Sequence, residues 1–155
     1  MTEPLYAEDL VPGTTITLGT YTVTRAEIVE FATAWDPQGF HVDEDVAAAG
    51  AFGGLIASGI HSMAIFQRLA VDGAFRHWAL IAGRSIQDVQ MTAPVRPDDE
   101  LTGRIHVDAV VPKGHGRALV TTSCVLMCGE VPVLSFRGTS YVRTRSSPRE
   151  DPATG

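Results

Sequence analysis

The segment GIHSMAIFQRLAV, residues 59–71, is apolar nearly all round when it is drawn as a helix. This pattern predicts a helix that is buried in a protein core. Gly73 follows the segment and is a natural helix stop. The apolar residues are Ile60, Met63, Ala64, Ile65, Phe66, Leu69 and Ala70.

After this helix the chain changes to the two-residue period of β-strands. In residues 100–111 the odd positions are mainly apolar and the even positions polar, which predicts a strand with one solvated face. Its apolar residues are Leu101, Ile105, Val107, Ala109 and Val111. Three further β-rich runs cover residues 83–95, 117–128 and 131–144, with turns at 96–100 and 129–130. Residues 14–24, broken by Gly19, predict an earlier strand or short hairpin.

A shorter helix is predicted between the first strand and the central segment. Thr24 and Glu27 fit a capping box at its start. Pro37 disfavours helical geometry in the preceding residue, so the helix should stop near Asp36. Its apolar stripe consists of Ile28, Phe31, Ala32 and Trp35.

The order of these elements indicates the fold class. A sheet with one long apolar helix must bury that helix against its inner face, which gives a two-layer α+β domain. The open edges of such a sheet would pair readily with a second copy. We therefore expect a homodimer with a continuous sheet, and a dimer of dimers stays open.

Length and charge restrict the function. A chain of 155 residues predicts a single domain, placed at residues 1–145, and the polar segment 146–155 predicts a disordered tail. The net charge of −6 disfavours nucleic acid as a partner. No run predicts a membrane helix and the first ten residues do not resemble a signal peptide, so a cytoplasmic location is expected.

The two cysteines, Cys124 and Cys128, are four residues apart on a predicted strand. Four residues of strand span about 13 Å, which is too far for a disulfide. We expect two buried thiols on one face of the strand.

The segment WDPQGFHVDEDVAAAGAFGGLIASGIHSM, residues 35–63, contains the residues that indicate chemistry. Asp36 lies at a predicted helix end, and His41 follows five residues later. Both side chains could face one pocket and hold a water, which is an arrangement for general acid and base catalysis. Alternatively, Asp36 caps a turn and His41 is an ordinary loop histidine. Residues 37–58 predict a packed functional loop with at most one turn at 43–49.

The start of the central helix is a second candidate feature. Backbone N–H groups around Gly59 and Ile60 lack partners inside the helix, and the helix dipole is positive there. They could stabilise an oxygen that develops negative charge. We expect Gly59, Ser58 and Gly54 to contact a substrate, although the glycines could instead serve only close packing.

Residues 36–63 resemble the signature of the MaoC-like dehydratases, which include the (R)-specific enoyl-CoA hydratases and have the hot-dog fold. The resemblance lies in Asp36, His41, Asp43 and the glycine at the helix start, in that order. It implies an antiparallel sheet wrapped around a long central helix. It also implies that Asp36 and His41 are catalytic, and that the Gly59 amide binds an oxyanion.

The reaction implied by the resemblance is reversible addition of water to a trans-2-enoyl thioester of coenzyme A or acyl carrier protein, giving the (R)-3-hydroxyacyl thioester. Asp36 is expected to act as the base toward water and His41 as the proton donor, and no metal or redox cofactor is needed. Gln38 and Gly39 stand where the family often has Asn-Pro, which predicts a more flexible loop. Gln67 stands where some (R)-hydratases have serine, so the acyl-chain preference stays open.

Two alternatives remain. The same fold hosts thioesterases, and a non-catalytic acyl-binding protein is a third possibility. Ser58 and Ser62 lack the GxSxG context of a serine hydrolase. His61 is expected to be a packed, hydrogen-bonded histidine. The remaining histidines form no cluster, and four basic residues that could meet coenzyme A phosphates stay unassigned: Arg84, Arg96, Lys113 and Arg117.

Overall fold

The computed structural model describes residues 2–145 of the chain. The predicted disordered tail, residues 146–155, lies outside the described residues. Within residues 2–145, no helix is long and apolar enough to cross a membrane.

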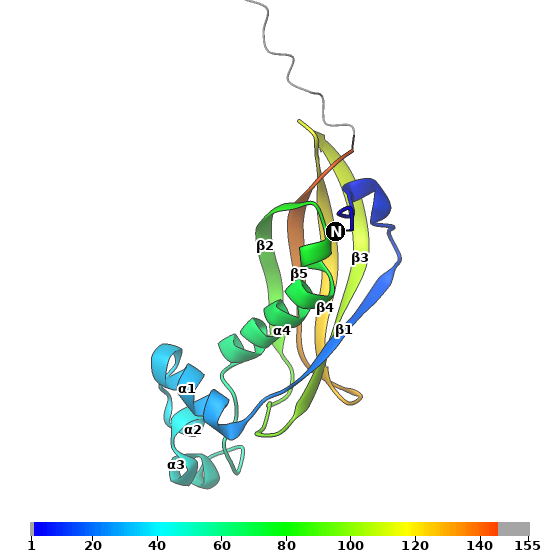
Figure 1. Ribbon diagram of the computed structural model, residues 1–155. Coiled ribbons are helices and arrows are strands. Elements are labelled where there is room, and N and C mark those ends of the chain that lie inside the picture. The colour runs from blue at the N-terminus through cyan, green and yellow to red at the C-terminus, as the bar shows by residue number, and fades with distance from the viewer. Residues whose placement is uncertain (1, 146–155) are drawn as a thin grey trace, which may run out of the picture.

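Five strands of the described chain form one antiparallel sheet in the order β1-β3-β4-β5-β2 (Figure 1). The strand before the central helix and the four after it are confirmed. β1 and β2 are the two edges of the sheet. The strands are β1 (Thr15–Thr22), β2 (Leu80–Met91), β3 (Glu100–Gly114), β4 (Arg117–Cys128) and β5 (Val131–Arg143).

The central helix α4 (Gly59–Gly73) lies across the inner face of the sheet, as the hot-dog fold requires (Figure 1). Phe66, on the buried face of α4, is 1% exposed and stacks edge-on against Phe136 of β5. The prediction that α4 is apolar and buried all round is wrong, because Ile60 is 56% exposed and Ala64 is exposed too. The helix is amphipathic, with a buried face made of His61, Ser62, Ile65, Phe66, Leu69 and Ala70.

Helix α1 (Arg25–Trp35) ends one residue before Asp36, as Pro37 predicts. Half of the predicted capping box is present: the Glu27 amide donates to Thr24 Oγ1, while the Glu27 carboxylate accepts from the Tyr21 hydroxyl instead. The apolar stripe of α1 does not extend to Trp35, whose side chain is 76% exposed.

The segment after α1 is more regular than its sequence predicts. It forms two short helices, α2 (Gly39–Val42) and α3 (Glu44–Ala49). Asp43 separates them, and its carboxylate accepts hydrogen bonds from the Asp45 and Val46 amides. This cap fixes the start of α3. Two 3₁₀ turns, Ala7–Asp9 and Phe75–His77, complete the described helical elements.

A β-bulge in β3 changes which side chains face the core. The pairing with β4 shifts between Val107 and Ala109, so the alternation slips by one residue. Val107 is 1% exposed, whereas Val111 is 46% exposed and Val110 packs against the core in its place. The prediction that Ala109 and Val111 share the buried face of Val107 is therefore wrong.

The cysteines are free thiols, and Cys124 is buried as predicted. Burial raises the pKa of Cys124 to about 11. Cys128 is only half-buried, so the expectation of two buried thiols holds for one of them.

The bulge can be tested with the same substitution on either side of it. Val107→Ala should lower the free energy of unfolding by about 1.5–3 kcal/mol, because it removes a fully buried side chain. Val111→Ala should change it by less than about 0.5 kcal/mol, as is usual for surface positions. Urea unfolding of both variants measures the difference, and equal losses would contradict the bulge.

Candidate active site

A pocket of about 450 Å³ lies at the N-terminus of α4, next to the end of β2. Asp36 and His41 both line it, together with Ser58 and Gly59. Much of the remaining wall is apolar and comes from Phe40, Phe52, Ile56, Ile60, Met91, Ala93, Val95 and Val133. The structure therefore brings together four of the five residues expected at the site.

The carboxylate of Asp36 is held by two side-chain donors. Ser58 Oγ donates to Oδ2 at 2.7 Å, and Gln38 Nε2 donates to Oδ1 at 2.7 Å. These hydrogen bonds, that from Ser58 first, hold the pKa of Asp36 below its ordinary value. Asp36 is consequently ionised at neutral pH and fixed in orientation.

His41 is 4% exposed and has a defined tautomer. Its Nδ1 lies 2.7 Å from the carbonyl oxygen of Ile56. Because a carbonyl only accepts, Nδ1 carries the proton and Nε2 of the neutral ring is an acceptor. Nε2 lies 3.4 Å from Asp36 Oδ2, so the imidazole and the carboxylate are neighbours in the lining of the pocket.

Gly59 is the first residue of α4, and its N–H has no hydrogen-bond acceptor within residues 2–145. The next amide is different: the Ile60 N–H donates to Ser58 Oγ at 3.2 Å. Of the two amides expected to be available, only that of Gly59 is unused. It lies beside the Asp36–His41 pair, where a helix N-terminus is positive.

Gly54 does not line this pocket. A Cβ at Gly54 would meet only Arg96 Nη1, at an ordinary 3.5 Å. Arg96 itself donates from Nη2 to the Phe52 carbonyl oxygen at 2.7 Å, so it fixes the loop at the pocket wall. Neither contact gives Gly54 a role in the chemistry.

Sequence reasoning missed what Gln38 and Ser58 do. In the sequence Gln38 predicts a more flexible loop, yet in the structure it stands at the N-cap position of α2 and its side chain donates to Asp36 instead of capping the helix. Ser58 is fully buried and joins α4 to Asp36, a residue 22 positions earlier. A serine before a helical pattern signals an N-cap, but no spacing rule connects it to Asp36.

His61 is buried and stacks on Phe31 with a 4.5 Å centroid separation. The predicted hydrogen bond is not present, because Nδ1 has no partner within the described chain. Burial lowers the pKa of His61. Gln67 is also absent from the walls of the pocket and lines a smaller hollow between α4 and the sheet.

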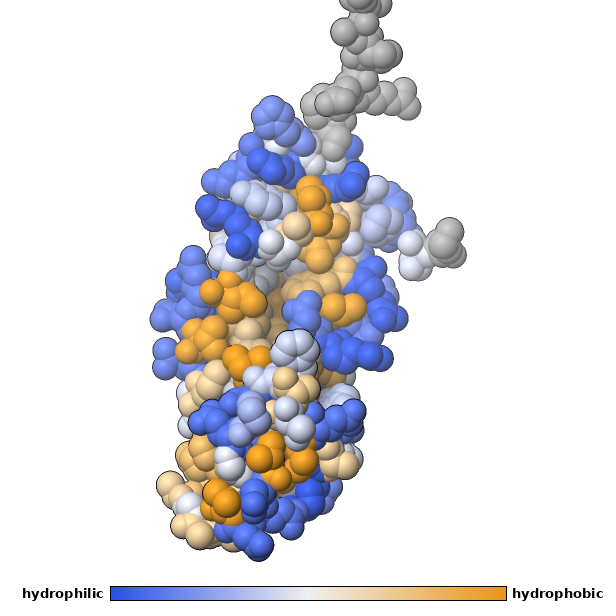
Figure 2. Space-filling view, turned by 90° about the vertical axis from the view of Figure 1, so that its left-hand side faces the viewer, coloured by the Kyte–Doolittle hydropathy of each residue, from blue (hydrophilic) through white to orange (hydrophobic). Residues whose placement is uncertain are grey.

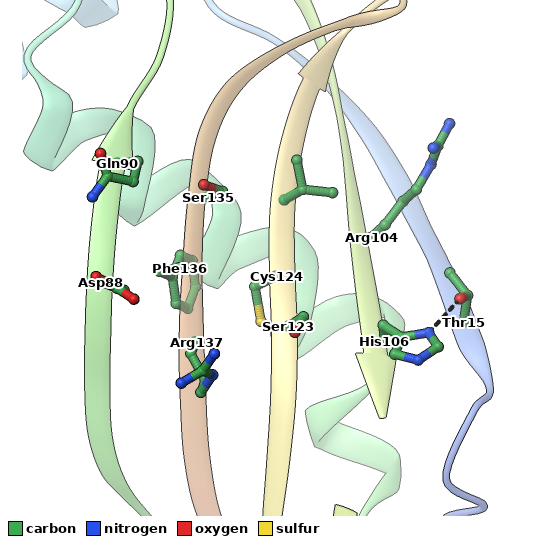
Figure 3. A pocket seen from close by; sticks show the side chains of 11 residues that line it. Thr15, Asp88, Gln90, Arg104, His106, Ser123, Cys124, Ser135, Phe136 and Arg137 are labelled. Atoms are coloured by element: carbon green, nitrogen blue, oxygen red, sulfur yellow. Dashed lines mark hydrogen bonds between the residues drawn. The ribbon is translucent and has the colours of Figure 1, made fainter. Parts of the chain in front are cut away.

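A second hollow, of about 500 Å³, lies on the outer face of the sheet, with α4 behind it (Figure 3). His106 binds Thr15 there at 2.8 Å, while Ser123 Oγ donates to Asp108. His106 Nε2 and Asp108 Oδ1 are 3.8 Å apart, and the two side chains are 43% and 31% exposed. Within residues 2–145, no group of three His, Cys, Asp or Glu side chains could hold a metal. The pocket at α4 is therefore the better candidate site.

The role of Ser58 can be tested by titrating Asp36. Ser58→Ala removes the strongest donor to the carboxylate, so the pKa of Asp36 should rise toward its ordinary value. Because the pKa of Asp36 is lower in the folded protein than in the unfolded chain, the ionised carboxylate stabilises the fold at any pH above its ordinary pKa. This contribution is lost as the pH falls through the pKa of the folded protein. The variant should therefore lose part of this stabilisation at neutral pH. Carboxyl NMR titration measures the pKa.

Thr24→Ala is the matched control, because it also removes an N-cap hydroxyl but does not touch Asp36. Each variant should lose about 1 kcal/mol of stability from its cap. An unchanged Asp36 pKa in Ser58→Ala would contradict the assignment.

Comparisons with known proteins identify the family of this chain. Residues 9–125 match the model of the MaoC like domain. The uncharacterized protein YdeM of Bacillus subtilis is 38% identical over 99 residues, covering 64% of this chain and 70% of that protein. The crystal structure of the MaoC-like dehydratase from Rhodospirillum rubrum is 34% identical with a TM-score of 0.84, covering 91% of this chain and 98% of the other. The (R)-hydratase PhaJ1 from Pseudomonas aeruginosa shares the fold, with 20% identity, a TM-score of 0.72 and coverage of 91% and 87%. The chain belongs to the MaoC-like domain family.

Proposed function

We propose that this protein is an enoyl-thioester hydratase, which adds water reversibly to a trans-2-enoyl thioester to give the (R)-3-hydroxyacyl thioester. The observation that carries the proposal is the 3.4 Å pairing of His41 Nε2 with Asp36 Oδ2, beside the unused Gly59 amide. The Rhodospirillum relative is described as a dehydratase, and two (R)-hydratases share the fold.

The pairing suits a water molecule. When His41 is neutral, Nε2 and the Asp36 carboxylate both accept, so they repel unless a hydrogen lies between them. A water can donate one hydrogen to each acceptor. Its oxygen lone pairs then face the pocket, where C3 of the enoyl group would lie. Positioning of this kind can supply a large part of the rate enhancement.

The tautomer of His41 favours a division of roles that differs in one part from the one expected from the sequence: His41, not Asp36, takes the water proton, and His41 remains the proton donor to C2. Asp36 is a weak base because its hydrogen bonds from Ser58 and Gln38 lower its pKa, whereas Nε2 of the Nδ1-protonated His41 ring has a lone pair that can accept a proton. In the proposed step the water oxygen bonds to C3, the C2–C3 π pair moves toward the carbonyl oxygen, and Nε2 takes the water proton. His41 then delivers this proton to C2, and Asp36 stabilises the imidazolium meanwhile.

Gly59 supplies the third part of the mechanism. As the thioester becomes enolate-like, its oxygen gains negative charge, which the Gly59 N–H and the positive end of α4 would stabilise. The apolar walls of Phe40, Ile56 and Val95 strengthen this interaction by excluding water.

The decisive assay follows loss of the enoyl absorbance of crotonyl-CoA together with release of thiol. The parent should consume the enoyl band without freeing thiol. Asp36→Asn and His41→Ala should each lose about a thousandfold or more, because each removes a group that orients water or moves its proton. Full activity in either variant would contradict the proposed roles.

Asp108→Asn and His106→Ala are matched controls, because they alter an exposed Asp–His pair outside the pocket. They should retain activity. Thiol release by the parent would indicate a thioesterase instead, and tight binding without turnover would indicate an acyl-binding protein.

We also propose that the chain forms a homodimer through edge strand β2. Every residue of β2 is half-buried or exposed, and among the strands of residues 2–145 it pairs with β5 alone. Its exposed aliphatic side chains include Ile81, Ile86 and Val89. Figure 2 shows hydrophobic groups along this side of the molecule. Pairing of two β2 strands would extend the sheet and cover these side chains. The single domain at residues 1–145 and the cytoplasmic location stay predictions.

Ile86→Arg tests the dimer, because it places a charge in the middle of β2, where the parent is 58% exposed. The parent should have the mass of a dimer, or a multiple of it, in light scattering, and Ile86→Arg should give a monomer. Val111→Arg, at an exposed valine of β3, is the control and should leave the mass unchanged. A monomeric parent would contradict the proposal.

A further inference from the structure

The space beside Gly59 is occupied by the side chain of Met91. A Cβ built on Gly59 would overlap Sδ and Cε of Met91 and would lie 3.1 Å from its Cγ. Met91 is the last residue of β2 and lines the same pocket as Asp36 and His41. The thioether therefore lies against the residue whose amide is unused.

The position of the thioether matters because of helix geometry. Side chains of a helix tilt toward its N-terminus, and the first N–H groups point the same way. A group in the Cβ direction of Gly59 consequently lies beside the Gly59 N–H. A thioester carbonyl that approaches this amide from the Cβ side of Gly59 would meet Met91.

Met91 can move without the strand moving. Its backbone is paired with Leu134 of β5, and the following Thr92 amide donates to the Val133 carbonyl at 3.0 Å. The side chain, by contrast, is 57% exposed. Methionine has an unbranched side chain with several rotatable bonds, so it can swing at low cost.

We propose that the Met91 side chain is a movable cover on the Gly59 amide, which must swing aside before a thioester carbonyl can bind there. This inference rests on the proposed function of the site. A closed cover competes with the ligand, and the apparent affinity equals the affinity of the open site multiplied by the fraction of time that the site is open. Met91 would thus help to set which thioesters bind and how tightly.

The competing explanation is that Met91 only fills space. In that case position 59 is glycine to make room for Met91, and the ligand never needs the same space. The two explanations differ in what happens when the thioether is removed, with and without a methyl group at position 59.

Binding of butyryl-CoA, a saturated thioester that cannot be hydrated, tests the cover without relying on turnover. Met91→Ala should bind it several-fold more tightly in calorimetry, since a cover closed about nine-tenths of the time weakens binding about tenfold. The methyl NMR signal of Met91 in the parent should shift on binding. Met127→Ala, on β4 away from the pocket, is the matched control and should bind as the parent does. Unchanged or weaker binding by Met91→Ala would overturn the proposal.

A double-mutant cycle separates cover from filler. Gly59→Ala should lose butyryl-CoA binding. Its methyl group would permanently occupy the space that the Met91 thioether must vacate before the ligand can bind. Gly59→Ala combined with Met91→Ala should fold, since the overlap is gone, but should still bind poorly. Recovery of binding in the double variant would show that Gly59 only accommodates Met91. Thermal unfolding verifies that the double variant is folded.

Turnover of crotonyl-CoA by the parent separates this proposal from the proposed function. A parent that binds butyryl-CoA, with the Met91 effects above, but does not hydrate crotonyl-CoA supports the cover and contradicts the hydratase. A parent that hydrates crotonyl-CoA while Met91→Ala binds no more tightly supports the hydratase and overturns the cover. A parent that binds neither thioester overturns both.

Discussion

The hydroxyl of Ser58 makes the two hydrogen bonds on which the candidate site depends. It accepts from the Ile60 amide, which caps α4, and it donates to Asp36 at the end of α1. Because Ser58 is fully buried, neither bond competes with water. One side chain therefore fixes where the central helix starts and how the carboxylate is oriented. It also engages the Ile60 amide, so of these two amides only that of Gly59 has no acceptor within residues 2–145.

The sequence predicted the features that depend on local pattern. The N-cap at Thr24, the end of α1 before Pro37 and the change of period after Gly73 all follow from neighbouring residues. The pairing of Asp36 with His41 was also predictable, because only five positions separate them and a chain that turns there can bring them together. The structure adds the distance, the tautomer and the donors that hold the carboxylate.

The features that the sequence did not predict depend on contacts between distant segments. The bulge after Val107 arises in the pairing of β3 with β4, and a strict two-residue period places Val111 on the wrong face. Ser58 and Asp36 are joined across the whole of α2 and α3. Met91 and Gly59 meet only because β2 ends beside the start of α4. No local pattern contains these distances.

The candidate site lies beside edge strand β2, which is also the strand through which we propose that the dimer forms. β2 provides both the open edge and, through Met91, the contact with Gly59. A second copy that pairs with β2 would hold the backbone of this strand in place on both sides. The rigid parts of the site would then be the helix start and the strand, and the moving part a single side chain. The Gly59 amide belongs to the helix start, and the Asp36 carboxylate and the His41 imidazole are held by hydrogen bonds. Movement of the Met91 side chain alone would therefore leave the positions of these three groups unchanged.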